Sequence, residues 1–281
     1  MRFYSGDFVT PYPKANSRAV GPDEALKAPV LVGAVGGSGT RVVARILSSA
    51  GFFIGAERNY AEDSEPLMRF YNVWLRRYLE CDGALPRSAT GAAAADFHEA
   101  IDEHRRGIAG PDEPWAVKVP RSLLMLPYWQ EAFPEARFIH VVRSGLDMAY
   151  SSDENQVRTF GDILLLHNEQ ALERPQRAMA YWRTVNLLAA QVGLSSFGSR
   201  YFLLRFEDLC QRPQETVSAL AAFLGTSLDA EQAGREVVPP PSIGRWRKHD
   251  AYEIRSLITL GRPALEHFGY CDSDTNSPRI G

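Results

Sequence analysis

Residues 29–47 read Pro-Val-Leu-Val-Gly-Ala-Val-Gly-Gly-Ser-Gly-Thr-Arg-Val-Val-Ala-Arg-Ile-Leu. The apolar run 29–35 is rich in β-branched side chains and is bounded by proline and glycine, which predicts a buried strand. Residues 36–39 then turn the chain, and apolar side chains recur at helical spacing from Thr40 to Leu47. This succession of strand, glycine-rich loop and helix decides the fold that we expect.

Three further apolar stretches are predicted to be strands, with helical patterns between them. The strands are expected at residues 115–119, 137–142 and 201–206, and the helices at residues 122–132, from 145, at 175–191 and after 213. This alternation predicts an α/β fold in which a P-loop-like central parallel sheet carries helices on both faces. Ligands bind outside the carboxyl ends of the strands in such sheets, so the loops that follow the strands are the ones to search.

Length and composition indicate one soluble domain without a general affinity for polyanions. The chain has 281 residues and a formal net charge of -3, which gives no case for nucleic acid or an anionic membrane surface. We expect residues 1–28 to form an N-terminal arm and residues 29–281 to form a single domain. No apolar run suits a signal peptide or a membrane span, and the three cysteines have no paired spacing, so the cytoplasm is the expected location.

The loop at residues 36–39 has the features of a phosphate site. Its glycines allow a close approach of the backbone, the helix that follows directs N–H groups at an anion, and two residues add hydroxyl donors: Gly36, Gly37, Ser38, Gly39 and Thr40. No lysine follows Gly39, as a Walker A loop requires, and Val42 replaces the last glycine of a dinucleotide-binding fingerprint. A tight strand–helix turn without a ligand is the alternative.

Two motifs in this order resemble those of the sulfotransferases that depend on 3'-phosphoadenosine 5'-phosphosulfate (PAPS). Ser38-Gly39-Thr40 matches the core of that family's 5'-phosphosulfate loop. The family's 3'-phosphate site is an arginine at a strand end and a serine eight residues later, and Arg143 and Ser151 have this spacing. Arginine offers a charge-assisted fork for phosphate, and serine adds a hydroxyl. The resemblance implies that these residues bind PAPS.

Two other segments extend the resemblance to about residues 29–248. Residues 204–209 look like the family's strand that ends in an aromatic-Glu-Asp-Leu pattern, which implies that Phe206 stacks on adenine. Residues 239–248 look like the basic C-terminal loop that closes over the nucleotide. This second likeness implies that two arginines of the loop contact the nucleotide, Arg245 and Arg247.

The phosphate loop also departs from the family pattern. Gly37 stands where the family usually has a lysine or an arginine, and Arg41 stands where a second threonine is frequent. We hypothesise that Arg41 or Lys118 supplies the missing positive charge. A lysine within an apolar strand is costly unless its head reaches a partner, and a snorkelling edge lysine is the alternative. The resemblance implies that Lys118 contacts the leaving group.

The general base is expected to be a carboxylate from the acidic stretch after the phosphate-loop helix. Pro120 stands where the aryl and steroid type of sulfotransferase has a histidine, two residues after the lysine. In the protein-tyrosine and Golgi types a glutamate follows the helix, and Glu57 matches that placement. Asp63 and Glu65 are rivals for the same role, and a solvated acidic loop is the alternative.

No metal site is predicted around the histidines. His140 lies within an apolar strand and is expected to be a satisfied core residue. His98 and His104 lie among glutamates, but their spacing does not bring them to one helix face, and a solvated helix is expected there. Sulfuryl transfer should resemble loose, in-line phosphoryl transfer, which needs positioning and positive charge but no redox cofactor.

The predicted function is transfer of a sulfuryl group from PAPS to a hydroxyl or amine, by in-line displacement with a carboxylate base. A P-loop nucleotide kinase-like phosphotransferase and an inactive nucleotide-binding protein are the alternatives. The run 147–161 is most like bacterial members of the family. The acceptor is expected to be a small molecule or a glycan held by variable loops at residues 59–87 and 158–176. Neither nucleic acid nor a membrane span is expected as a partner.

Overall fold

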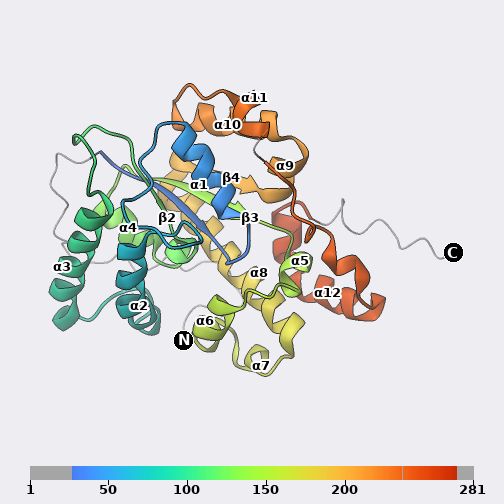
Figure 1. Ribbon diagram of the computed structural model, residues 1–281. Helices are drawn as coiled ribbons and strands as arrows, with labels where there is room; N and C mark the ends of the chain where they lie inside the picture. Colours follow the sequence, from blue (N-terminus) through green and yellow to red (C-terminus); the bar gives the residue numbers. More distant parts are fainter. Residues whose placement is uncertain (1–26, 236, 271–281) are drawn as a thin grey trace.

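The central sheet has four parallel strands in the order β2-β1-β3-β4 (Figure 1). The computed structural model describes residues 27–235 and 237–270, so the predicted arm at 1–28 lies almost entirely outside the described residues. The strands are β1 (Val30–Ala34), β2 (Ala116–Lys118), β3 (Arg137–Val142) and β4 (Tyr201–Arg205). All four were predicted, although the last ends one residue early, because Phe206 begins a helix. The α/β fold class with its parallel sheet is confirmed.

The connection after β1 leads to β2 at one edge of the sheet, whereas the connection after β3 leads to β4 at the other edge. After β1 it runs through α1 (Thr40–Ser49), α2 (Glu65–Glu80) and α3 (Arg87–His104) to β2. It then crosses to the other side of β1 through η1 (Pro120–Leu124) and α4 (Leu126–Ala132) and enters β3. The carboxyl ends of these strands therefore meet at a topological switch point, which is the place where parallel sheets of this kind bind ligands.

The remaining helices follow β3 and β4. They are α5 (Gly145–Ala149), α6 (Asn155–Leu164), α7 (His167–Gln170), α8 (Arg174–Val192), η2 (Gly193–Phe197), η3 (Gly198–Arg200), α9 (Phe206–Gln211), α10 (Pro213–Leu224), α11 (Ala230–Arg235), η4 (Arg245–Lys248) and α12 (Ala251–His267). The helix predicted at residues 122–132 is interrupted, since a short 3-10 turn ends at Leu124 before α4 starts. Pro127 lies in the first turn of α4, where its missing N–H costs nothing, so the sequence favours a new helix start there.

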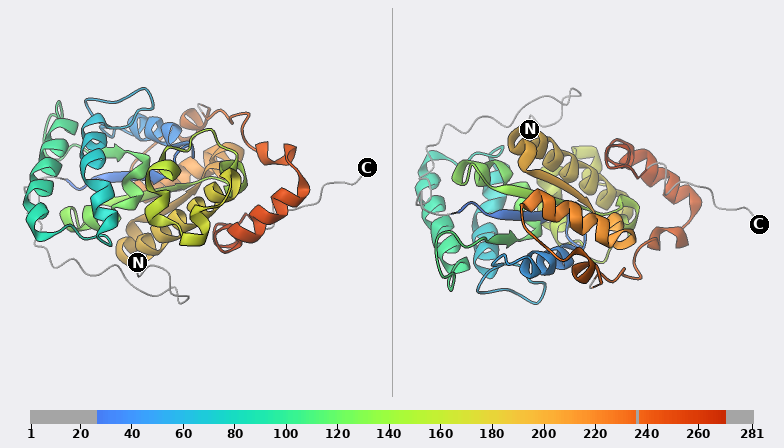
Figure 2. Two further views of the ribbon diagram at one scale, coloured as in Figure 1. Left: turned by 90° about the horizontal axis from the view of Figure 1, so that it is seen from below. Right: turned by 90° about the horizontal axis from the view of Figure 1, so that it is seen from above.

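Helices cover both faces of the sheet, as predicted. Val30 and Val32 of β1 belong to an apolar cluster with Val43 of α1 and Leu220 of α10, whereas Leu31 belongs to a second cluster on the opposite face. Figure 1 shows α1, α9, α10 and α11 on one side of the sheet and α2, α6 and α8 on the other, and Figure 2 shows the two sides in turn. Burial on both faces explains why the strands read as continuous apolar runs.

The segments 59–87 and 158–176, predicted to be loops, are largely helical. They contain α2 and most of α6 and α7, and Arg76 of α2 forms an ion pair with Asp162 of α6. The aromatic residues along one face of α2 are buried in the core: Phe70, Tyr71, Trp74 and Tyr78. The two segments are thus joined to each other, but by helices that belong to the domain's framework.

Candidate functional site

The loop between β1 and α1 is a tight turn that depends on glycine. Gly37 and Gly39 have φ values of +86° and +89°, which side chains rarely adopt. Ser38 donates from its backbone N–H and its hydroxyl to the carbonyl of Val35, at 3.3 Å and 2.6 Å. The helix α1 begins directly afterwards at Thr40. The sequence of strand, glycine-rich loop and helix is therefore confirmed, and the geometry fits a site for a phosphate-like anion.

Phe206 packs against this loop. A Cβ atom on Gly39 would lie 2.2 Å from the ring of Phe206, so no other side chain fits at this position. The guanidinium carbon of Arg143 lies 5.5 Å from the centroid of the same ring. Phe206 therefore joins the loop after β1 to the arginine after β3, while its contact with adenine stays a prediction.

Arg143 and Ser151 both lie next to Gly37. Arg143 is 3% exposed, and its Nη1 lies 3.5 Å from the carbonyl oxygen of Gly37. The hydroxyl of Ser151 lies 3.3 Å from the point where a Cβ on Gly37 would stand. Two residues that the sequence separates by a helix thus reach the same point of the glycine-rich loop. An anion there would meet a guanidinium, a hydroxyl and backbone N–H groups together.

Of the two arginines predicted in the basic loop, Arg245 lies beside Arg143. Its side chain donates to the carbonyls of Ser242 at 3.1 Å and Tyr150 at 3.3 Å. Burial lowers the pKa of Arg245, and the positive charge of Arg143 lowers it further. Arg247 instead lies over the ring of the adjacent Trp246, with 4.9 Å between its guanidinium carbon and the ring centroid.

Lys118 is buried at the end of β2, and its ammonium group has two partners. It is 2% exposed, and its Nζ donates to Oδ1 of Asp63 at 2.5 Å and to the carbonyl of Ala61. Burial lowers the pKa of Lys118, and the nearby carboxylate of Asp63 opposes that shift. The lysine head thus reaches a partner at the carboxyl edge of the sheet, as expected for a lysine in an apolar strand.

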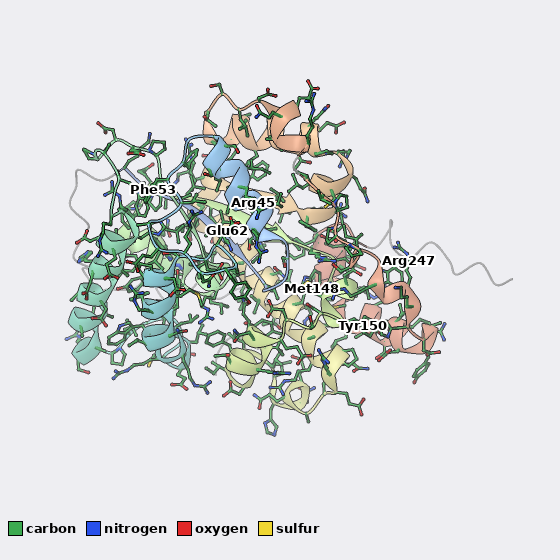
Figure 3. All side chains as sticks on the ribbon, in the orientation of Figure 1. Arg45, Phe53, Glu62, Met148, Tyr150 and Arg247 are labelled. Atoms are coloured by element: carbon green, nitrogen blue, oxygen red, sulfur yellow. The ribbon has the colours of Figure 1, made fainter. Side chains whose placement is uncertain are left out.

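The segment 57–64 brings Asp63 to Lys118. Asn59 organises it, because its side-chain oxygen accepts from the backbone N–H groups of Ala61 at 2.9 Å and Asp63 at 3.0 Å. Glu62 forms an ion pair with Arg45 of α1 at 3.0 Å, and Figure 3 labels this pair near the centre of the molecule. The segment is thus held by its own asparagine and by α1.

His104 holds the segment 57–64 against β2, so the prediction of a solvated histidine is wrong. It is fully buried, its Nδ1 lies 2.8 Å from the hydroxyl of Ser64, and its Nε2 lies 3.1 Å from the carbonyl of Ala116. Nε2 must donate to that carbonyl, so Nδ1 accepts from Ser64. Burial lowers the pKa of His104 to about 4. His140, in contrast, is the satisfied core residue that was predicted, since Tyr201 and Asn186 bind its ring nitrogens.

Glu57 does not join Lys118. Its carboxylate forms ion pairs with Arg106 at 3.2 Å and with Arg69 at 3.8 Å, and all three side chains are substantially exposed. The rival Asp63 is the carboxylate that contacts the lysine. Of these carboxylates it is therefore Asp63 that lies at the lysine, while the role of Glu57 as base stays a prediction.

Sequence reasoning missed Arg121 and Asp147. Arg121 lies in η1, three residues after Lys118, and donates to the side-chain oxygen of Asn72 at 2.8 Å. Burial lowers the pKa of Arg121, while the carboxylates of Asp63 and Asp153 raise it. Its place directly after a strand end was the available signal. Asp147 is fully buried, but a lone aspartate in a helical pattern gives no signal of that in the sequence.

The described residues offer neither a metal site nor a membrane span. Within 27–235 and 237–270, no three His, Cys, Asp or Glu side chains gather as a metal ion would require. In the same ranges no helix is long and apolar enough to cross a bilayer.

Arg41, one of the two candidates for the missing positive charge, is exposed at the start of α1, and its charge contributes weakly to lowering the pKa of Lys118.

Comparisons with known proteins bear on this arrangement. Residues 29–230 match the model of a family described as the Sulfotransferase family. The structure is similar to a sulfotransferase domain from the curacin biosynthetic pathway, at 12% identity and a TM-score of 0.54 over 87% of this chain and 99% of that one. No curated protein matches the chain.

Two further solved structures share the fold. One is sulfotransferase STF9 from Mycobacterium avium, at 13% identity and a TM-score of 0.50 over 86% of this chain and 77% of that one. The other is the sulfotransferase domain of the olefin synthase from Synechococcus PCC 7002, at 16% identity and a TM-score of 0.50 over 87% and 97%. At such identities the likeness establishes the fold alone.

Proposed function

The chain belongs to the sulfotransferase family, and from this premise we propose that it transfers a sulfuryl group from PAPS to a hydroxyl or amine of an acceptor. One observation supports the proposal most. Arg143 and Ser151, the pair expected to bind a 3'-phosphate, both lie next to Gly37 of the loop expected to bind the 5'-phosphosulfate. A nucleotide that carries both phosphates would find the groups proposed to bind them side by side.

The nucleotide is proposed to bind along the edge formed by the ends of β1 and β3. The glycine-rich loop, with the hydroxyl of Thr40, would hold the phosphosulfate end, because N–H groups at the start of a helix are directed at an anion. The hydroxyl of Ser38 would first have to leave the carbonyl of Val35. Arg143, Ser151 and Arg245 would hold the 3'-phosphate. The guanidinium groups of Arg143 and Arg245 repel each other, and an anion between them would relieve that repulsion.

The reacting groups are proposed to be Lys118 and Asp63. In the transfer, the acceptor oxygen or nitrogen forms a bond to sulfur, and the bond from sulfur to the phosphate oxygen breaks. The acceptor's proton passes to the carboxylate of Asp63, and the ammonium of Lys118 stabilises the charge that develops on the leaving phosphate. The products are the sulfated acceptor and 3'-phosphoadenosine 5'-phosphate (PAP). Asp63 takes the role expected for Glu57 because it contacts the lysine.

Several finer points belong to the same proposal. We propose that residues 29–281 act as one domain, that the protein works in the cytoplasm of a bacterium, and that the acceptor is a small molecule or a glycan. A nucleotide kinase-like phosphotransferase is the second candidate, yet the absence of a lysine after Gly39 counts against it. An inactive nucleotide-binding protein is the third, and the buried pair of Lys118 and Asp63 counts against that.

A binding experiment and a transfer experiment test the proposal. PAP should raise the melting temperature well above the shift that AMP produces, because only PAP carries the 3'-phosphate. Labelled sulfur from PAPS should pass to a member of a panel of sugars, phenols, lipids and peptides in the presence of EDTA. Equal shifts from PAP and AMP would remove the 3'-phosphate site. Transfer from ATP that requires Mg²⁺ would favour the phosphotransferase.

A further inference from the structure

One buried carboxylate connects Arg143 with the basic loop of residues 239–248. Asp147 lies in α5, one turn after Arg143, and is 1% exposed. Its Oδ2 accepts from the backbone N–H of Gly244 at 2.8 Å and lies 3.6 Å from Nη2 of Arg143. Its Oδ1 lies 3.4 Å from the backbone N–H of Trp246. The two oxygens therefore bind the loop at two points and the arginine at a third.

Other contacts complete the attachment of the loop. Nη2 of Arg143 donates to the hydroxyl of Ser242 at 2.9 Å. The ring of Tyr150, which follows α5, stacks on that of His249 at 3.5 Å between centroids. Figure 3 labels Tyr150 and Arg247 in this part of the molecule. Residues 242 and 244–246 of the loop thus contact Arg143, Asp147 or Tyr150.

A carboxylate at this place has an electrostatic cost. Its negative charge lies beside the arginine that is proposed to attract a phosphate, so it weakens that attraction. Burying the carboxylate is also costly unless hydrogen bonds and an ion pair compensate. The compensation here comes from the loop and from Arg143. What offsets the electrostatic cost of the carboxylate is therefore that it fixes the positions of the loop and of Arg143.

We propose that Asp147 is a positioning residue that holds the basic loop over Arg143 and so makes the site selective for a nucleotide 3'-phosphate. The inference rests on the proposed function, because it takes PAP as the ligand. It also predicts the sign of an effect. Were Asp147 only a nearby negative charge, its removal would strengthen phosphate binding; because it positions the loop, its removal weakens binding.

The test compares PAP with AMP by titration calorimetry on the full chain. In Asp147→Ala, PAP should bind about tenfold or more weakly, which is the usual effect of losing a charge-assisted hydrogen bond, while AMP should change by less than about twofold. Asp147→Asn, which keeps oxygen and shape but not charge, should fall between this variant and the wild type. Asp229→Ala is the matched control, since Asp229 also accepts two backbone N–H groups, of Glu231 and Gln232, but at the start of α11.

Limited digestion with trypsin gives a readout that needs no ligand. Cleavage after Arg245, Arg247 or Lys248 should be faster in Asp147→Ala than in the wild type and in Asp229→Ala. Saturating PAP should slow it less in the Asp147 variant than in the wild type.

Three outcomes would overturn the proposal. Unchanged or tighter PAP binding in both Asp147 variants would leave the carboxylate no positioning role. Equal weakening of PAP and AMP would show general damage to the fold. A wild-type protein that does not distinguish PAP from AMP would remove the proposed function as well, and this failure is recognised without any variant.

Discussion

The two ends of the candidate site are built from the same kind of pair but by different routes. At the end of β2, Lys118 pairs with Asp63, a residue 55 positions away in a separate segment. At the end of β3, Arg143 pairs with Asp147, only one helical turn further along the chain. Both pairs are buried, and both flank the glycine-rich loop after β1. The proposed reaction assigns chemistry to the first pair and binding to the second.

This difference has a functional consequence. Asp147 lies only four residues after Arg143, in the short helix α5 that follows it, so this pair forms within one local segment of the chain. The pair of Lys118 and Asp63 exists only when the segment 57–64 lies correctly on β2, which requires Asn59, Ser64 and His104. Under the proposed reaction, changes at the Lys118 end should affect turnover, and changes at the Arg143 end should affect nucleotide binding.

The largest expected effect lies at the Lys118 end. Asp63→Asn keeps the size and one oxygen of the side chain but cannot take up the acceptor's proton. Turnover should fall about 10²–10⁴-fold, the usual contribution of general base catalysis. The affinity for PAP should stay within about twofold, since the variant leaves the arginine end intact. Turnover is measured as PAP released from PAPS, and affinity by calorimetry. If Asp63→Asn lost both turnover and affinity for PAP, the two ends of the site would not have separate roles.

Arg143→Ala should produce the reverse pattern. Removing one member of a buried charged pair commonly costs about 2–5 kcal/mol of binding, so PAP should bind far more weakly. AMP, without the 3'-phosphate, should lose much less. The measurement is the dissociation constant of each nucleotide for wild type and variant. If AMP weakens as much as PAP, Arg143 is not the reader of the 3'-phosphate.

A third effect comes from the buried histidine beneath the Lys118 end. Burial lowers the pKa of His104 from its ordinary 6.5 to about 4, so the unfolded chain binds a proton that the folded one refuses. The sign is that stability is full above pH 6.5 and is lost as the pH falls to about 4. A shift of this size corresponds to about 3 kcal/mol.

Urea unfolding at several pH values measures this effect. His104→Asn should be less stable at pH 7, but its free energy of unfolding should fall less steeply between pH 7 and 4. His140, also buried with a pKa of about 4, stays present in both proteins and cancels in the comparison. Parallel curves for variant and wild type would show that His104 does not carry the acid sensitivity.

The smallest effect is expected at Glu57. Its carboxylate takes part in exposed ion pairs with Arg69 and Arg106, and exposed pairs contribute about 0–1 kcal/mol. Glu57→Gln should therefore keep turnover within about twofold and stability nearly unchanged. A loss of turnover as large as that of Asp63→Asn would return the role of the base to Glu57.

How much the sequence reveals follows the same division. The four strands, the glycine-rich turn and the spacing of Arg143 and Ser151 are local patterns, and the structure contains each of them. The placement of Asp63 on Lys118 and the burial of His104 depend on contacts between distant segments. The spacing of apolar residues along the chain does not reveal contacts between distant segments. The acidic stretch at residues 57–65 therefore predicted a carboxylate but could not select one.

The remaining differences have equally specific causes. The sequence predicts loops at 59–87 and 158–176 because the many charges there mask the periodicity of helices that bury only one face. The helix predicted at 122–132 is divided at Met125. Pro120 lies at the start of the 3-10 turn before this residue, and Pro127 lies in the first turn of the helix after it. Asp147 was overlooked because its partners, the backbone N–H groups of Gly244 and Trp246, lie about a hundred residues further along the chain.

The strand order also governs how the chain must assemble as it is synthesised. β1 is made first, yet its neighbours begin only at Ala116 and Arg137, and it lies between them in the finished sheet. At synthesis rates of about 5–20 residues per second, this apolar strand waits roughly 5–20 s for its second partner. Such high contact order makes folding slow and leaves a sticky edge exposed to aggregation. Nascent chains that stop before β3 should therefore depend on chaperones, whereas chains that extend past β4 should not.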